Sequence, residues 1–169
     1  MTTTLGAPIG HATLTAESQQ IVFTRRYNKP VEKVWAAITI PERLAAWLAF
    51  AEFEPKAGGA INLVWGDNAN TMQGRVLAYE PARLFSWTWT LDGRETVVRF
   101  ELAPDGDDTV LTLTHSGLAP NHGPGGGVRA GWHAHLDALP GALEGRATSL
   151  EETHAHMKQD LVALYPLPG

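Results

Sequence analysis

The sequence contains no cysteine, which excludes a disulfide framework, a thiolate nucleophile and a zinc–thiolate site. It also has no excess of positive charge. Lysine and arginine together number 13 against 18 aspartates and glutamates, for a formal net charge of −5. A nucleic-acid-binding protein normally carries a clustered basic face, so we expect no nucleic-acid partner.

Long hydrophobic runs are missing too. No apolar stretch approaches the roughly 18 residues that cross a bilayer. Residues 1–5 lack the charged and apolar regions of a signal peptide. We therefore expect no membrane span and a cytoplasmic location.

What the chain does contain is typical of one globular domain. Of its 169 residues, 44% are hydrophobic and 18% are charged, which suits a folded domain with a substantial core. Residues 1–18 lack sustained periodicity, so we expect a flexible N-terminal arm with an early strand around residues 11–15. Residues 19–169 then form the single domain. Its six tryptophans predict either a filled aromatic core or the wall of a cavity.

Periodicity divides this domain into strands and helices. Alternation of apolar and polar residues predicts strands at residues 20–27, 51–55, 61–65, 72–79, 84–90, 96–102 and 109–113. Apolar residues at helical spacing predict helices at residues 30–38 and 41–47, from 128 onward, and at 150–164. Pro140-Gly141 either kinks the third helix or ends it, and Ser149 is the expected N-cap of the last. Antiparallel strands with helices inserted early and added late indicate an α+β class.

One strand alternates most clearly. Phe85, Trp87 and Trp89 share one face, which we expect to point inward. Ser86 and Thr88 share the other, which we expect to point outward, because side chains alternate across a strand with a period of two.

Two signatures about seventy residues apart carry a family resemblance. The first spans residues 25–35 and 40–47, where a strand runs into a helix and then into a short helix with a tryptophan. The second spans residues 112–118 and 131–139. Between them lie a Gly-Gly turn at 58–59, a strand at 74–77 and a Glu80-Pro81 step. In this order, over residues 19–165, they resemble the SRPBCC superfamily of START-related helix-grip domains. Within it they resemble the branch named after the C-terminal domain of the heat-shock-protein-90 ATPase activator.

This resemblance implies a helix-grip fold, in which a curved antiparallel sheet of about six or seven strands wraps a long C-terminal helix. Two small helices follow the first strand. It also implies an interior large enough to hold a ligand. Inward strand positions and the stripe of the long helix predict the ligand-binding residues: Trp65, Met72, Trp87, Trp89, Phe100, Leu113, His115, Trp132 and Leu136. Met72 is included because a flexible thioether adapts to varied ligands.

The seven histidines raise the question of a metal site. His133 and His135 are two residues apart, as are His154 and His156, and such positions point to different sides of a helix. Zinc sites also need three or four convergent ligands. We therefore expect no metal and no cofactor.

His115 continues an apolar strand face and should point inward. A catalytic interpretation makes it a general base. The alternative is a core histidine bonded to a backbone carbonyl near Gly117. No Ser-His-Asp arrangement accompanies it, so we favour the core histidine and expect no catalytic residue.

Two other features have ordinary explanations. The glycine-rich residues 123–127 lack the Lys-Ser/Thr of a P-loop and are expected to form a flexible loop near the cavity mouth. Of Arg25 and Arg26, one should face outward. The other should reach a carboxylate such as Glu52, Glu54 or Glu101.

The leading functional interpretation is a binding protein rather than an enzyme. It would hold a small apolar or amphipathic ligand, lipids included, between the sheet and the long helix. One alternative is an enzyme of the polyketide cyclase type, which shares the fold and would use the same cavity. Another is a cofactor of a chaperone ATPase that acts by surface contact. The sequence names neither the ligand nor the oligomeric state.

Overall fold

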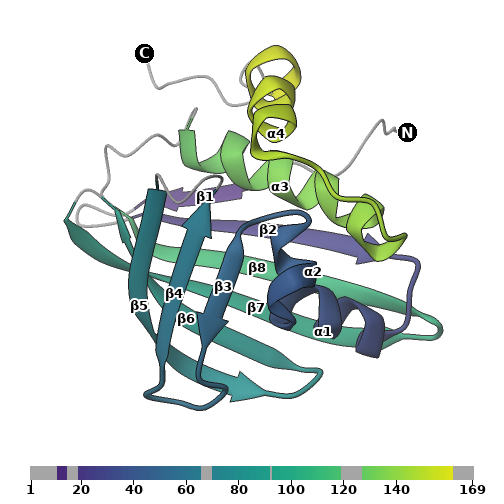
Figure 1. The fold of residues 1–169 in the computed structure, drawn as a ribbon, viewed down its shortest axis with the longest axis horizontal. Coiled ribbons are helices and arrows are strands. Elements are labelled where there is room, and N and C mark those ends of the chain that lie inside the picture. Colours follow the sequence, from purple (N-terminus) through teal and green to yellow (C-terminus); the bar gives the residue numbers. More distant parts are fainter. Residues whose placement is uncertain (1–10, 15–18, 66–69, 92, 119–126, 162–169) are drawn as a thin grey trace.

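The computed structural model describes residues 11–14, 19–65, 70–91, 93–118 and 127–161. Its strands form one antiparallel sheet in the order β1-β2-β8-β7-β6-β5-β4-β3 (Figure 1). The strands are β1 (His11–Leu14), β2 (Gln19–Tyr27), β3 (Phe50–Phe53), β4 (Ala60–Trp65), β5 (Asn70–Glu80), β6 (Leu84–Leu91), β7 (Arg94–Asp105) and β8 (Asp108–Leu118). The expected six or seven strands correspond to β2–β8, and the early strand is β1.

Antiparallel pairs of consecutive strands build most of the sheet. The register pairs Leu91 with Arg94, as the Asp-Gly dipeptide at residues 92–93 predicts for a two-residue turn. It also pairs Asp105 with Asp108. Between these two residues, Gly106 has a φ of +63°, which a glycine adopts without steric cost. β2, although early in the chain, pairs with β8 and so brings residues some ninety positions apart into contact.

The helices are α1 (Val31–Thr39), α2 (Pro41–Ala45), α3 (Gly127–Leu143) and α4 (Leu150–His156), followed by a π-helical turn, η1 (Met157–Leu161). α3 does not end at Pro140, which lies inside it. Ser149 caps α4 as predicted. Its side chain accepts from the Glu152 N–H, while the Glu152 side chain accepts from the Ser149 N–H, which forms a capping box. Residues 162–164 of the expected last helix and 123–126 of the glycine-rich loop lie outside the described residues.

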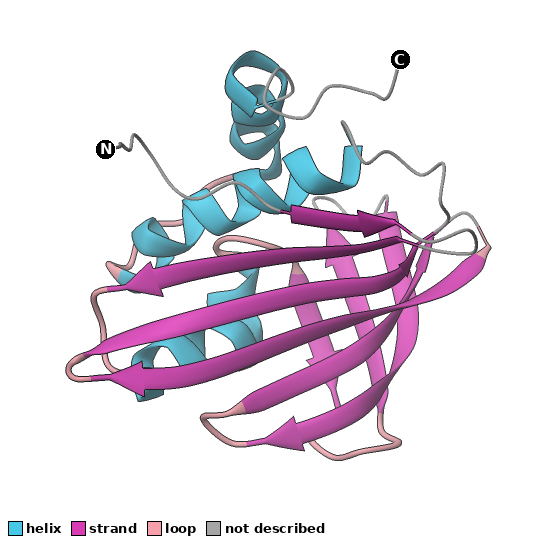
Figure 2. Ribbon diagram, turned by 180° about the vertical axis from the view of Figure 1, so that it is seen from behind, coloured by secondary structure: helices cyan, strands magenta, loops and turns pink. Residues whose placement is uncertain are grey.

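The sheet curves around the helices. α3 lies across one face of it, α1 and α2 lie on the same side, and α4 stacks on α3 away from the strands (Figures 1 and 2). This is the helix-grip arrangement. β2 shows how the sequence produces the core, because Ile21, Phe23, Arg25 and Tyr27 are buried and the residues between them are not. Alternate side chains of a strand therefore face α3.

β6 largely follows its predicted alternation. Phe85 and Trp87 are buried and Trp89 is half-buried. Ser86 and Thr88 sit on the opposite face, as expected, but they are buried there as well. The Ser86 hydroxyl donates to the Val98 carbonyl. The Thr88 hydroxyl accepts from the Arg75 N–H.

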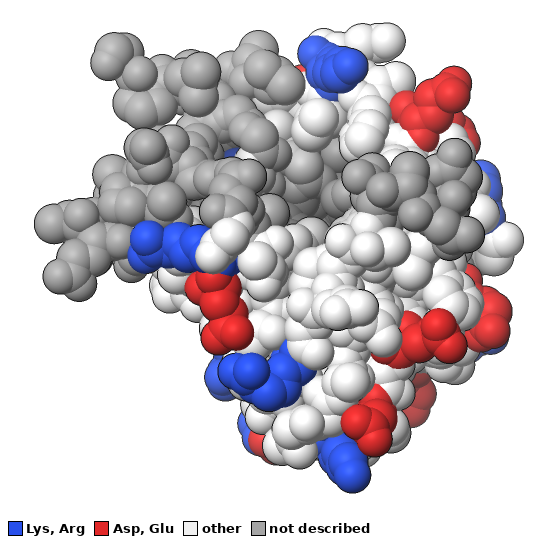
Figure 3. Space-filling view, turned by 60° about the vertical axis from the view of Figure 1, so that its left-hand side comes forward, with Lys and Arg blue, Asp and Glu red and all other residues white. Residues whose placement is uncertain are grey.

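The surface and the helices limit the kinds of partner. Among the described residues, no helix combines the length and apolar character that a membrane crossing needs. On the face drawn in Figure 3, acidic and basic side chains are interspersed. Such a face lacks the single-sign field that attracts a polyanion.

Candidate functional site

Trp89 is the centre of an aromatic cluster on the inner face of the sheet. Its ring stacks on Trp87 at 5.2 Å and lies 5.4 Å from Trp65. It also meets Trp132 of α3 edge-on at 5.4 Å, and His115 at 5.8 Å. Ring pairs at such distances contribute beyond their area burial. We call the following six residues the inner aromatic cluster: Trp65, Trp87, Trp89, Phe100, His115 and Trp132.

The structure therefore brings six of the nine predicted ligand-binding residues into one set of ring contacts. Phe100 joins through Trp132, with ring centroids 6.0 Å apart. Leu113 lies directly opposite Phe100 in the register. Met72 and Leu136 have no aromatic ring and so lie outside this set of ring contacts, but they are buried in the same hydrophobic core. Whether the nine residues surround a ligand stays a prediction.

The cluster runs from the surface to the interior. Trp65 and Trp89 are half-buried, whereas Trp87, Phe100 and Trp132 are at most 4% exposed. The half-buried pair is thus accessible from outside. A planar molecule that reached it would meet a continuous aromatic surface leading inward.

His115 is a satisfied core histidine. Its Nδ1 accepts from the Trp132 indole N–H at 3.0 Å, so the neutral ring carries its proton on Nε2. That Nε2 lies 2.7 Å from the Thr96 hydroxyl, which itself donates to the Trp89 carbonyl. We expected His115 to bond a backbone carbonyl near Gly117, and this prediction of its partner was wrong, because its ring nitrogens meet Trp132 and Thr96. Because both ring nitrogens are engaged, neither offers the free lone pair that a general base needs.

Sequence reasoning missed a second aromatic group beside the first. Trp35 of α1 packs against Tyr79 and Phe85, and Phe53 of β3 contacts the same two rings. Phe85 reaches Trp87 at 6.4 Å and so joins the two groups. The helical spacing of apolar residues in α1 predicts that Trp35 faces the core. That spacing does not identify Tyr79 of β5 as its partner.

A polar cluster at the junction of β2, α3 and α4 was also missed. Arg25 is 4% exposed and its Nη1 lies 2.9 Å from Asp137 Oδ1. Asp137 Oδ2 lies 2.8 Å from His156 Nε2 and 3.4 Å from His133 Nε2. His156 Nδ1 lies 2.8 Å from Asp160 Oδ2. We call these five residues the Asp137 cluster.

This cluster corrects the expected arginine partners. Arg25 points inward, as one of the pair should, but it reaches Asp137 of α3 rather than Glu52, Glu54 or Glu101. Arg26 is exposed and pairs with Asp105 and Asp108 at the β7–β8 turn.

Burial and hydrogen bonding shift the pKa values of three histidines. Burial lowers the pKa of His133, against the opposing effect of Asp137. Burial also lowers the pKa of His135 to about 4, although its Nδ1 lies 2.9 Å from the Trp47 carbonyl. Partial burial lowers the pKa of His156 as well, but hydrogen bonds to Asp137 and Asp160 outweigh it and leave that pKa raised. Within the described residues, no group of three or more His, Cys, Asp or Glu could hold a metal ion.

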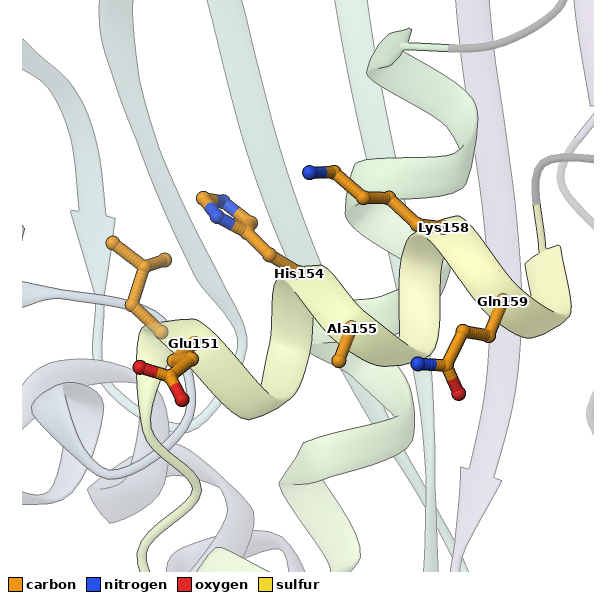
Figure 4. A pocket seen from close by; sticks show the side chains of 6 residues that line it. Glu151, His154, Ala155, Lys158 and Gln159 are labelled. Atoms are coloured by element: carbon orange, nitrogen blue, oxygen red, sulfur yellow. The ribbon is translucent and has the colours of Figure 1, made fainter.

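Three surface hollows are lined by residues outside the inner aromatic cluster. One of about 660 Å³ follows α4 and η1, from which Glu151, His154 and Lys158 project (Figure 4). A second, of about 460 Å³, lies on the outer sheet face near Gly74 and Thr88. The third, of about 330 Å³, lies where the end of β2 meets the end of α3. Exposed side chains line most of each, so these are open hollows rather than enclosed small-molecule pockets.

The model of the family described as "Activator of Hsp90 ATPase homolog 1-like protein" matches residues 28–144. No curated protein matches the chain significantly.

Solved structures share the fold. CalU16 from Micromonospora echinospora is 26% identical, with 92% of each chain covered and a TM-score of 0.70. A Bordetella parapertussis protein encoded by BPP1335 is 27% identical over the full length of both chains, with a TM-score of 0.60. DynU16, from the dynemicin biosynthetic locus, is 25% identical with a TM-score of 0.65. There the match covers 76% of this chain and 48% of DynU16.

Proposed function

Because the chain belongs to the family of Activator of Hsp90 ATPase homolog 1-like proteins, a branch of the SRPBCC superfamily of helix-grip domains, we propose that it binds a small molecule between sheet and helix. The ligand is apolar or amphipathic, and it lies against the inner face of the sheet and α3. We propose this role for a cytoplasmic protein.

The inner aromatic cluster is the observation that carries the proposal. Small-molecule sites are mostly apolar, with a few polar groups that fix orientation. The cluster supplies flat ring surface from four strands and α3, and its half-buried members, Trp65 and Trp89, are accessible from outside. The origin of DynU16 in a biosynthetic locus is consistent with a small-molecule ligand.

The enzyme alternative receives less support from the same residues. A cyclase would need a polar pair inside the cavity with a group free to move a proton. His115 is the titratable member of the cluster, and both its ring nitrogens are hydrogen-bonded.

A titration with 1-anilinonaphthalene-8-sulfonate tests the proposal. This amphipathic probe becomes fluorescent when it leaves water. We expect saturable binding at one site and a raised unfolding temperature, because a ligand that binds only the folded state stabilises it.

Two variants locate the site. Trp89→Leu removes the central ring of the cluster and should weaken probe binding about tenfold, which corresponds to about 1.4 kcal/mol. Phe50→Leu, at an exposed position on β3, is the matched control and should leave binding unchanged. Equal effects of the two variants, or no saturable binding by the wild type, would contradict the proposal. The latter result would favour surface contact with a chaperone.

A further inference from the structure

Three buried tryptophans differ in what their indole N–H groups do. Trp47 donates to the Ala37 carbonyl at 2.9 Å, and Trp132 donates to His115 Nδ1 at 3.0 Å. Trp87 is only 1% exposed, yet its Nε1 has no hydrogen-bond partner among the described residues. Buried donors are nearly always paired, so this one requires an explanation.

The residues around Trp87 provide no obvious acceptor. Its neighbours directly across the sheet are Val76 on β5 and Val98 on β7, both fully buried. Phe85 and Trp89 flank it along β6. A buried water needs two to four polar partners, and these side chains offer few. The N–H is therefore desolvated in a largely apolar setting, which costs the folded state free energy.

We propose that the Trp87 N–H is the hydrogen-bond donor that recognises the ligand. This inference rests on the proposed binding function and makes it more specific. The ligand presents an uncharged acceptor, such as a carbonyl oxygen, to Nε1. An anionic acceptor would lose its hydration without gaining a cation among these apolar neighbours. The ligand body is planar and aromatic, because Trp87 and Trp89 stack with their planes 23° apart.

A matched pair of probes isolates this single hydrogen bond. Fluorenone and fluorene have nearly the same planar shape, but only fluorenone carries a carbonyl oxygen. Their affinities are compared by quenching of tryptophan fluorescence. We expect the wild type to bind fluorenone about tenfold more tightly, the ratio typical of one buried hydrogen bond that satisfies an otherwise unpaired donor.

Trp87→Phe removes the donor and keeps an aromatic ring. The variant should bind both probes with the affinity that the wild type has for fluorene. The control is Trp47→Phe, which removes an indole N–H that is already bonded to Ala37, and it should keep the tenfold ratio. Trp47→Phe should also lower the unfolding temperature more than Trp87→Phe does, because only Trp47 loses a hydrogen bond.

A spectroscopic readout gives a second measurement. The carbonyl stretch of bound fluorenone should lie at lower frequency in the wild type than in Trp87→Phe, because hydrogen bonding weakens the C=O bond. Equal affinity of the wild type for both probes, or an unshifted stretch, would overturn the donor role and leave the binding function intact. If 1-anilinonaphthalene-8-sulfonate binds the wild type but neither of these probes does, the planar ligand with an uncharged acceptor is overturned, and if none of the three binds, the binding function itself fails.

Discussion

Arg25 and Arg26 are neighbours in the chain, but the geometry of β2 sends them into opposite environments. Arg26 lies in water and contacts two exposed carboxylates. Arg25 is buried, and its Nη1 meets Asp137 at 2.9 Å. Its Nε and Nη2 lack hydrogen-bond partners among the described residues. The Asp137 carboxylate is therefore the main group that compensates the buried positive charge of Arg25.

At the residue scale we predict that Asp137→Ala destabilises the fold by about 3 kcal/mol, because removing one partner of a buried pair leaves the other charge uncompensated. Urea denaturation followed by circular dichroism measures the loss. Asp105→Ala, which breaks an ion pair of the exposed Arg26, is the control and should cause no measurable change. Similar losses for both variants would show that Arg25 is solvated.

The sequence predicts the orientation of such residues but not their partners. Period-two alternation places His115 on an inward face and requires one of Arg25 and Arg26 to point inward, and both Arg25 and His115 are buried. The partner of Arg25 is 112 residues away, on a helix whose rotation against the sheet is set by packing. The alternation that orients a strand carries no information about which helical carboxylate will face it.

At the scale of the element, the contact between β5 and β6 allows almost no extra volume at Gly74. A Cβ at that position would lie 2.5 Å from the Thr88 carbonyl oxygen and 2.8 Å from its hydroxyl. This close approach helps to bury Thr88 on the outer face. Sequence alternation could not foresee it, because alternation does not specify the register of β5 against β6, which includes a shift between Val76 and Ala78.

Gly74→Ala should therefore destabilise the fold by about 1–3 kcal/mol, the usual cost of overpacking. Gly131→Ala is the matched variant. A Cβ there would meet only the Met157 sulfur, at 3.9 Å. Since Gly131 lies inside α3, the substitution should stabilise by about 0.5–1 kcal/mol. Thermal unfolding of the two variants distinguishes these outcomes, and a loss at Gly131 as large as that at Gly74 would contradict the packing argument.

His156 joins α4 to α3 in a way that depends on pH. Its two nitrogens meet Asp137 and Asp160, and both can donate only when the ring is protonated. Arg25 and His133 also face Asp137. Because its pKa in the folded state is raised above 6.5, the stabilisation is complete below the unfolded value. It is lost as the pH rises through the folded value.

We thus expect hydrogen-exchange protection of α4 to fall as the pH increases above about 6.5. His156→Gln should remove most of this dependence, whereas His154→Gln, on the exposed side of the same helix, should retain it. If the hydrogen-exchange protection of α4 in the wild type did not change with pH, the ion pairs of His156 would not be the contacts that hold α4 against α3.

Capping and turn signals were the most predictable features at this scale. Ser149 is the predicted N-cap, and the structure shows that it also forms a capping box with Glu152. The end of the same helix was harder to predict, because no signal in the sequence marks the change from α4 to the π-helical η1 after His156.

At the scale of the molecule, one core joins sheet and helices. Trp87 on β6 and Trp132 on α3 belong to the same buried cluster. We expect unfolding in urea to be a single transition, with tryptophan fluorescence and far-ultraviolet circular dichroism changing together. A fluorescence change that precedes the loss of secondary structure would mean that α3 separates from the sheet first.

The α+β class followed from periodicity and the helix-grip arrangement from the family resemblance, but the pairing of β2 with β8 was not predicted. Antiparallel neighbours joined by short turns are local and predictable. A strand that pairs with the far end of the chain finds its partner only when the whole sheet has formed, so no local pattern predicts that pairing. The same limit applies to the inner aromatic cluster. Inward positions could be identified from the sequence, but the contact of Trp89 with Trp132 depends on where α3 crosses the strands.

The stacking of Trp87 on Trp89 also has an optical consequence. Two indoles 5.2 Å apart and nearly parallel have transition dipoles close enough to couple, so that their excited states are shared. Trp65 and Trp132 both lie 5.4 Å from Trp89, which lets excitation migrate across four rings before emission. The protein therefore contains its own exciton-coupled chromophore, and the sign and splitting of its dichroism band record the angle between the two central rings.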